Sequence, residues 1–161
     1  MKRFRMAGVE KVSKNITKAI QEEQSLTQKG LIRAAIAVRR DMDKTSPITP
    51  VDTRNLDHSF YIVTPKRQVD KGGSFEGANA GKLASEHTKT MEFEQMKVLA
   101  FEKPAIGLGF TANYAAFVHE APPKTKFKRP GSGRKFFESA LERNRDTILQ
   151  ILREETGIIG K

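Results

Sequence analysis

The segment over residues 105–120, AIGLGFTANYAAFVHE, constrains the fold more than any other stretch of the chain. Three apolar residues alternate with two glycines between Ile106 and Phe110, which predicts a strand with one apolar face and one face without side chains. Glycine weakens a strand, so two glycines on one face indicate that another backbone lies close against it. The segment therefore predicts a strand of a sheet whose glycine face is covered, most simply by a helix.

A short helix is expected directly after this strand, and the prolines at 122 and 123 end it. Tyr114, Phe117 and Val118 share one side of that helix at i, i+3, i+4 spacing. We therefore expect these three side chains to anchor the helix on the sheet.

The chain begins with a helical pattern that runs over residues 7–43, after a basic stretch, residues 1–8, that is expected to be a flexible arm. Two apolar stripes follow each other with a shift in phase: Val9, Val12, Ile16, Ala19 and Ile20, then Leu31, Ala34, Ala35, Val38 and Met42. Gly30 follows a polar link and disfavours a helix interior. One bent helix and two consecutive helices are both compatible with this pattern. The sparsely apolar first half is either a solvated face or an arm that reaches a neighbouring subunit.

The middle of the chain contains a second predicted strand and a long irregular stretch. Pro47 and Pro50 end the first helix, and a single helical turn through Leu56, a further expected anchor, follows them. Residues 59–64 predict a strand with apolar side chains on both faces. Residues 66–92 are rich in glycine and lack periodicity, which predicts a mobile loop or an insertion. Alternation then returns, and residues 98–101 are expected to pair with one of the two strands.

The densest charge of the chain precedes its last helix. Six basic residues fall within twelve positions, and we consider them a candidate surface for DNA or for a partner protein: Lys124, Lys126, Lys128, Arg129, Arg134 and Lys135. A solvated loop or a charged edge strand would give the same pattern. A helix over residues 134–155 follows, with Phe137 and Leu141 as expected anchors and Gly157 as its left-handed cap.

Composition narrows the class of protein. The chain has 161 residues, of which 37% are hydrophobic and 30% charged, so its core is lean for a single self-sufficient domain. The formal charge of +10 favours acidic partners such as nucleic acid or an acidic protein ring. The absence of cysteine excludes disulfides and thiolate metal sites. No apolar run is long enough to cross a membrane, so we expect a protein made in the cytoplasm without a membrane partner.

No motif in the sequence predicts catalysis. Residues 77–82 resemble a phosphate-binding loop, but one residue is missing between the glycines and Leu83 replaces the metal-binding hydroxyl residue. His119-Glu120 begins a zinc-protease motif that lacks its second histidine. We therefore expect no enzyme activity, no cofactor and no metal site.

Three sequence blocks, in this order after a long first helix, resemble one known family. They are SPITPVDTRNLDHS from Ser46, NYAAFVHE from Asn113 and KFFESAL from Lys135. These blocks are similar to those of the neck, or tail-completion, proteins of long-tailed bacteriophages, also described as head–tail joining or minor tail proteins. Arg54 replaces the usual glycine of the first block, and Ala121-Pro122 replaces a usual Gly-Thr after the second.

The resemblance implies both a fold and a function. The implied fold is a single α+β domain over residues 1–161, with a long N-terminal helix, a small mostly antiparallel sheet with a short helix and a long loop, and a long C-terminal helix. The implied function is a homo-oligomeric ring of six or twelve copies in the virion neck. The implied partners are the head-closure or connector protein, the tail terminator or tail tube protein, and genomic DNA in the channel. The alternative function is a non-catalytic basic protein that binds nucleic acid.

Overall fold

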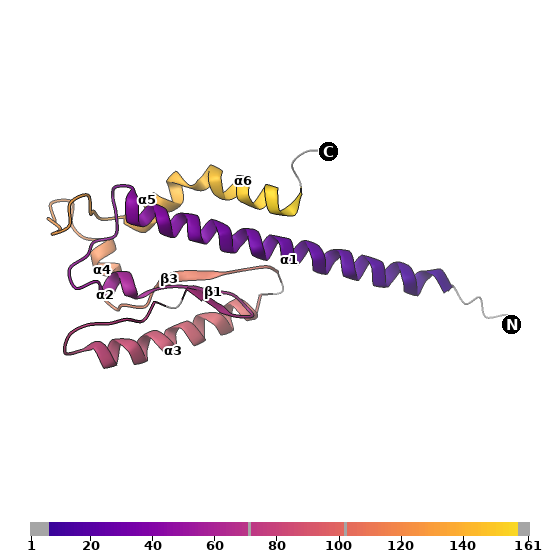
Figure 1. Ribbon diagram of the computed structural model, residues 1–161, viewed down its shortest axis with the longest axis horizontal. Helices are drawn as coiled ribbons and strands as arrows, with labels where there is room; N and C mark the ends of the chain where they lie inside the picture. The colour runs from indigo at the N-terminus through magenta and orange to yellow at the C-terminus, as the bar shows by residue number, and fades with distance from the viewer. Residues whose placement is uncertain (1–6, 71, 102, 158–161) are drawn as a thin grey trace.

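The α+β class is confirmed by a computed structural model, which describes residues 7–70, 72–101 and 103–157, with side chains from residue 14. Figure 1 shows a small sheet between two helical layers. Helix α1, Ala7–Lys44, and the C-terminal helices lie on one side, and helix α3, Ala80–Leu99, lies on the other. Of the predicted basic arm, residues 1–8, the first six residues lie outside the described part of the chain. Its last two residues, Ala7 and Gly8, begin α1. Among the described residues, no helix is long and apolar enough to span a membrane.

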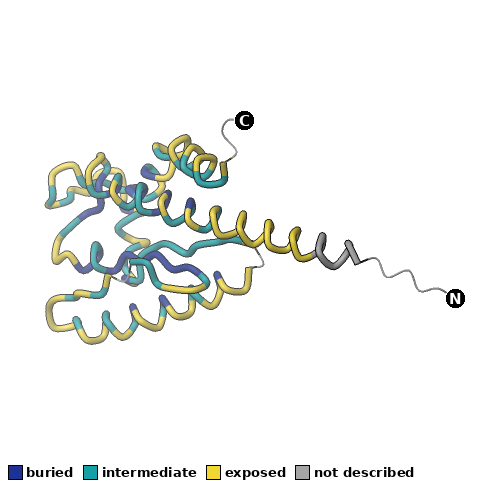
Figure 2. Tube along the Cα trace, turned by 45° about the vertical axis from the view of Figure 1, so that its right-hand side comes forward, coloured by how far each residue is buried: buried dark blue, intermediate teal, exposed yellow. Residues whose placement is uncertain are grey.

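Helix α1 is one continuous helix, Ala7–Lys44, so the alternative of two consecutive helices is wrong. Four of the five residues of the second predicted stripe are buried, with Val38 and Met42 at most 1% exposed, and Leu31 is half-buried. Residues 14–26 of the first half are exposed on all sides, and Figures 1 and 2 show this half projecting beyond the rest of the fold. The helix is therefore a core element in its second half and an arm in its first.

Gly30 lies where α1 meets the C-terminal helix α6, Arg145–Thr156. A Cβ atom at Gly30 would lie 3.0 Å from Leu152 Cδ2 and 3.4 Å from Glu155 Cβ. Glycine has a low intrinsic helix propensity, but at this position its missing side chain lets a second helix approach closely.

The sheet has three antiparallel strands in the order β2-β1-β3, with β1 Phe60–Val63, β2 Gln68–Asp70 and β3 Gly107–Phe110. Strand β1 is buried on both faces, as its apolar sequence predicts. Phe60 and Ile62 pack with the second half of α1, and Tyr61 and Val63 pack with α3. The central strand therefore joins two small apolar clusters into one domain.

The predicted loop over residues 66–92 is largely wrong, because it contains β2 and most of helix α3, Ala80–Leu99. The predicted strand pairing of residues 98–101 is also wrong, since Val98 lies on α3 and is 4% exposed. Only a few apolar side chains of α3, with Met91 and Val98 among them, reach the sheet, which explains why its periodicity is weak.

Side chains, and not another backbone, cover the glycine face of β3. A Cβ atom at Gly107 would lie 2.9 Å from Val63 Cγ2 and 3.2 Å from Val98 Cγ2 of α3, and one at Gly109 would lie 3.1 Å from the Tyr61 hydroxyl. The predicted cover by a helix is therefore confirmed only for the contact of Val98 with Gly107, and the predicted close approach of a backbone is wrong.

Short helices complete the fold. Helix α2 spans Asn55–His58, α4 spans Ala115–His119, and α5 spans Phe136–Arg143. The predicted C-terminal helix is interrupted at Asn144, which separates α5 from α6, and Gly157 ends α6 with a left-handed φ of 67° as expected.

Candidate functional site

The basic loop between α4 and α5 is held against the segment that follows α1. Ile48 forms a parallel bridge with Ser132, and the Ile48 amide donates a hydrogen bond to the Gly131 carbonyl at 3.0 Å. A second bond runs from the Gly133 amide to the Ile48 carbonyl at 3.3 Å. The loop is therefore attached at its C-terminal half to a distant part of the sequence.

Three of the six predicted basic residues contact groups of the protein itself. Lys128 Nζ lies 2.5 Å from Asp52 Oδ1, and Arg129 donates a hydrogen bond to the Asp43 carbonyl at 3.3 Å. Lys135 Nζ lies 2.7 Å from a Glu120 oxygen. The hydrogen bond between them raises the pKa of Lys135 and lowers the pKa of Glu120. Glu138, whose Oε2 lies 2.9 Å from Lys135 Nζ, raises the pKa of Lys135 further.

The other three basic residues differ from one another in exposure. Lys124 and Lys126 are exposed and form no ion pair with the described residues. Arg134 is half-buried, and its Nε has no hydrogen-bond partner within the described part of the chain. The structure thus distributes the six cations over several environments and does not bring them together on one free surface.

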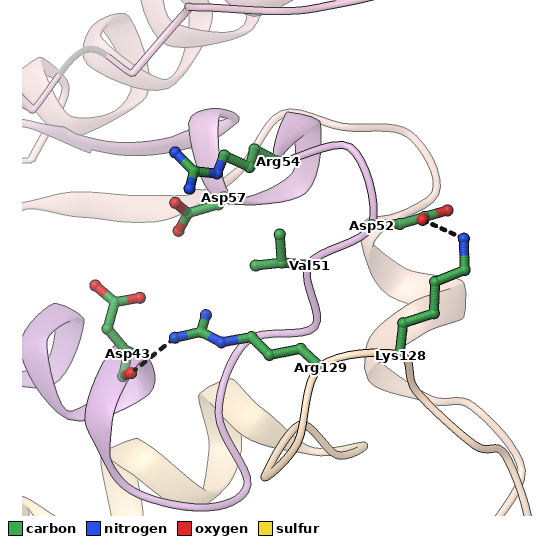
Figure 3. A pocket seen from close by; sticks show the side chains of 7 residues that line it. All are labelled: Asp43, Val51, Asp52, Arg54, Asp57, Lys128 and Arg129. Carbon is green, nitrogen blue, oxygen red and sulfur yellow. Dashed lines mark hydrogen bonds and ion pairs between the residues drawn. The ribbon is translucent and has the colours of Figure 1, made fainter.

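The hollow beside this loop has balanced charge (Figure 3). It has a volume of about 570 Å³ and is lined by three carboxylates and three cations besides Val51: Asp43, Asp52, Asp57, Arg54, Lys128 and Arg129. Arg39 forms ion pairs with both Asp43 and Asp57. Burial raises the pKa of Asp43, and the positive charge of Arg39 opposes this effect.

Ionic contacts dominate the side chains that line this hollow. Among the described residues, no three histidine, aspartate or glutamate side chains are grouped closely enough to hold a metal ion. Each carboxylate of the hollow is paired with a cation: Asp43 and Asp57 with Arg39, and Asp52 with Lys128. The expected absence of enzyme activity, cofactor and metal stays a prediction.

The three sequence blocks converge in space. Leu56 from the first block and Tyr114 and Val118 from the second line one small hollow of about 240 Å³ together with Phe127. The third block adjoins the second, because the Lys135 amide donates a hydrogen bond to the His119 carbonyl at 2.8 Å. The rings of His119 and Phe136 are 5.2 Å apart. Segments far apart in the sequence therefore form one packed unit at this end of the fold.

Four of the six expected anchors contact the core. Leu56 is 5% exposed, and Tyr114, Val118 and Phe137 are half-buried against the larger apolar cluster.

The anchors Phe117 and Leu141 are wrong, since they are 80% and 39% exposed. Phe136, which is 1% exposed, is the aromatic anchor that sequence reasoning missed, although it stands beside Phe137. In both cases the sequence predicts the helix in the right place, but not the side that faces the core. Adjacent positions of a helix point in different directions, so a small rotation of the helix exchanges buried and exposed residues.

Exposed apolar side chains gather at places other than the hollows. Ile16 and Ile20 lie on the projecting half of α1 with exposed fractions of 55% and 53%. A second group lies at the C-terminal end of α3, on the far side of the sheet: Phe93, Met96, Leu99 and Phe101. Two separate apolar surfaces on one chain are suited to contacts with other proteins.

Comparisons of the chain with protein-family models, with curated proteins and with solved structures find no match.

Proposed function

We propose that this protein is a structural subunit of a homo-oligomeric ring in the neck of a long-tailed bacteriophage, where it joins the head connector to the tail. The observation that carries the proposal is the projecting half of α1. An isolated helix of this length is marginal in water, and residues 14–26 are exposed over their whole circumference. A helix that is this exposed and carries an apolar stripe gains stability when a neighbour covers that stripe.

The neighbour that we propose is a second copy of the same chain. The apolar stripe of the arm, at Ile16 and Ile20, and the apolar end of α3, at Phe93 and Met96, are different surfaces of one subunit. Contact between two different surfaces is heterologous, and repeated heterologous contact generates a closed ring when the rotation closes. Six or twelve copies in the neck would satisfy this condition.

Two further features support the resemblance on which the neck assignment rests. The three sequence blocks pack against one another at one end of the fold. Arg54, which stands where the related sequences have glycine, takes a left-handed conformation with φ of 60°. Glycine is the residue that adopts this conformation most readily, so the glycine of the family pattern has a physical reason at this position.

The experiment tests the arm with a matched pair of double variants. Ile16→Glu with Ile20→Glu places charge on the apolar stripe, and Asn15→Glu with Thr17→Glu adds the same charge at exposed positions beside it. We expect light scattering and electron microscopy to show a ring for the wild type and the control pair, and a monomer for the stripe pair.

Two results would contradict the proposal. A wild-type protein that remains monomeric at high concentration, and is also missing from the neck of purified virions, would exclude the ring. Rings that form equally well from the stripe pair would show that the arm does not hold the subunits together. The alternative function, binding of nucleic acid outside a virion, is favoured by a basic groove that contains none of the six basic residues of the loop between α4 and α5.

A further inference from the structure

A groove of about 730 Å³ lies between α1 and one end of the sheet. Val63 pairs with Gly107, so the turn between β1 and β2 and the segment that enters β3 meet at the same end of the sheet. Five cations line the groove: Lys29 and Arg33 from α1, Lys66 and Arg67 from the turn, and Lys103 before β3. Gln28 Nε2 donates a hydrogen bond to the Ala105 carbonyl at 3.0 Å, which joins its two walls.

The groove has a large excess of positive charge. No carboxylate is among its described lining residues, and Glu155 on α6 pairs with Lys29 and Arg33. Counted over the described residues that line the groove or pair with its cations, five cations and one carboxylate leave a charge of +4. Lys66, Arg67 and Lys103 form no ion pair with the described residues. The hollow of Figure 3, in contrast, has three cations and three carboxylates. A cleft lined by one sign of charge concentrates its field and attracts the opposite charge.

The polar character of the groove continues along one face of the arm. Lys14, Lys18, Gln21, Ser25 and Gln28 follow one another at i, i+4, i+7, i+11 and i+14 on α1. Lys18 pairs weakly with Glu22 at 3.8 Å, and both side chains are exposed. From Lys14 to Lys29 the face extends for about 22 Å at 1.5 Å per residue. The apolar stripe at Ile16 and Ile20 lies on another side of the helix, so the two surfaces do not compete.

We propose that this groove, together with the basic face of the arm, binds the phosphate backbone of duplex DNA without reading its sequence. Lysine, arginine and glutamine side chains are common donors to phosphate oxygens. No aromatic side chain is among the described residues that line the groove, so single strands, which stack on aromatic rings, are disfavoured. A linear array of donors suits an extended polyanion better than a compact acidic ligand. The inference goes beyond the proposed ring and does not depend on it.

The test compares two triple variants of the full chain that lose the same charge. Lys66→Gln, Arg67→Gln and Lys103→Gln remove the free cations of the groove. The control replaces Lys44, Lys89 and Arg145, which are exposed and unpaired among the described residues and lie outside both the groove and the basic loop, with glutamine. Fluorescence anisotropy with a labelled duplex of mixed sequence measures affinity as salt is varied between about 50 and 200 mM.

The groove variant should bind with a salt slope about 2.7 smaller in magnitude, because each neutralised phosphate contributes about 0.9. The ratio of wild-type to variant affinity should therefore change about 40-fold across this salt range. The control should retain most of the wild-type slope. Arg67→Gln alone should reduce the slope by about 0.9, and circular dichroism of each variant checks that the fold is intact.

Three results would overturn the proposal. The first is a wild-type protein that does not bind the duplex at the lowest salt. The second is an equal loss of affinity in the groove and control variants, which would show that only net charge matters. The third is tighter binding of labelled polyglutamate than of duplex DNA through the same three residues, which would make an acidic protein the ligand.

Discussion

Replacement of Phe136 by alanine should be among the most damaging single changes to the core. The side chain is 1% exposed and packs in the larger apolar cluster with α1 and β1. Its ring lies edge-on to Phe110 at 5.6 Å and to His119 at 5.2 Å. Removal of a buried phenylalanine costs about 3–5 kcal/mol, because apolar transfer energy is lost and a cavity remains.

Phe117→Ala is the matched comparison. Both changes remove one phenyl ring from a short helix, but Phe117 is 80% exposed. A surface replacement of this kind changes the free energy of unfolding by no more than about 0.5 kcal/mol.

Thermal unfolding followed by circular dichroism measures the difference. For a chain of this size, 1 kcal/mol corresponds to about 3 °C, so Phe136→Ala should lower Tm by about 9–15 °C and Phe117→Ala by less than about 2 °C. The reasoning is refuted if the two variants melt together, or if Phe117→Ala is the less stable of the two. Either result would mean that α4 packs with its other side toward the sheet.

Two other predictions concern close packing and pH. Gly107→Val should lower the free energy of unfolding in urea by about 1–3 kcal/mol, because the added Cβ would lie 2.9 Å from Val63 Cγ2. Gly81→Ala is the control and should not destabilise the fold, since nothing lies within 4 Å of its added Cβ. Equal stability of the two variants would contradict the close packing at Gly107. The pKa of Glu155 is lowered by hydrogen bonds from two α1 cations, so its contribution to stability is present above the ordinary glutamate pKa and is lost as pH falls through the lowered value. Glu155→Gln should therefore melt below the wild type at pH 7, and the difference in Tm should shrink as pH falls below the ordinary glutamate pKa. A difference in Tm that does not change with pH would exclude the ion pair as the cause.

The sequence by itself determined the elements whose pattern is strong and local. The apolar stripe that ends at Val38 and Met42 is buried at four of its five positions, and β1 is buried on both faces. The alternation of Leu108 and Phe110 with two glycines forms strand β3, and Gly157 ends the last helix. In each of these, the spacing of side chains or the conformational freedom of glycine depends only on neighbouring residues.

Tertiary structure decided what depends on contacts across the chain. Helix α3 has few residues that reach the sheet, and a glycine-rich segment precedes it, so its periodicity does not predict a helix. The choice between Phe136 and Phe137, and the rotation that leaves Phe117 outside, are set by the elements that pack against α5 and α4.

The positions of the charged residues can be read from the sequence, but their ion pairs cannot. The density of basic residues over 124–135 is visible in the sequence, but their partners are not, since Lys128 meets Asp52 from 76 positions away. The groove likewise combines cations from α1, from the turn after β1 and from the segment before β3. The sequence shows which residues are charged. Only the packing of distant segments determines which of those charges are neutralised and which remain free for a ligand.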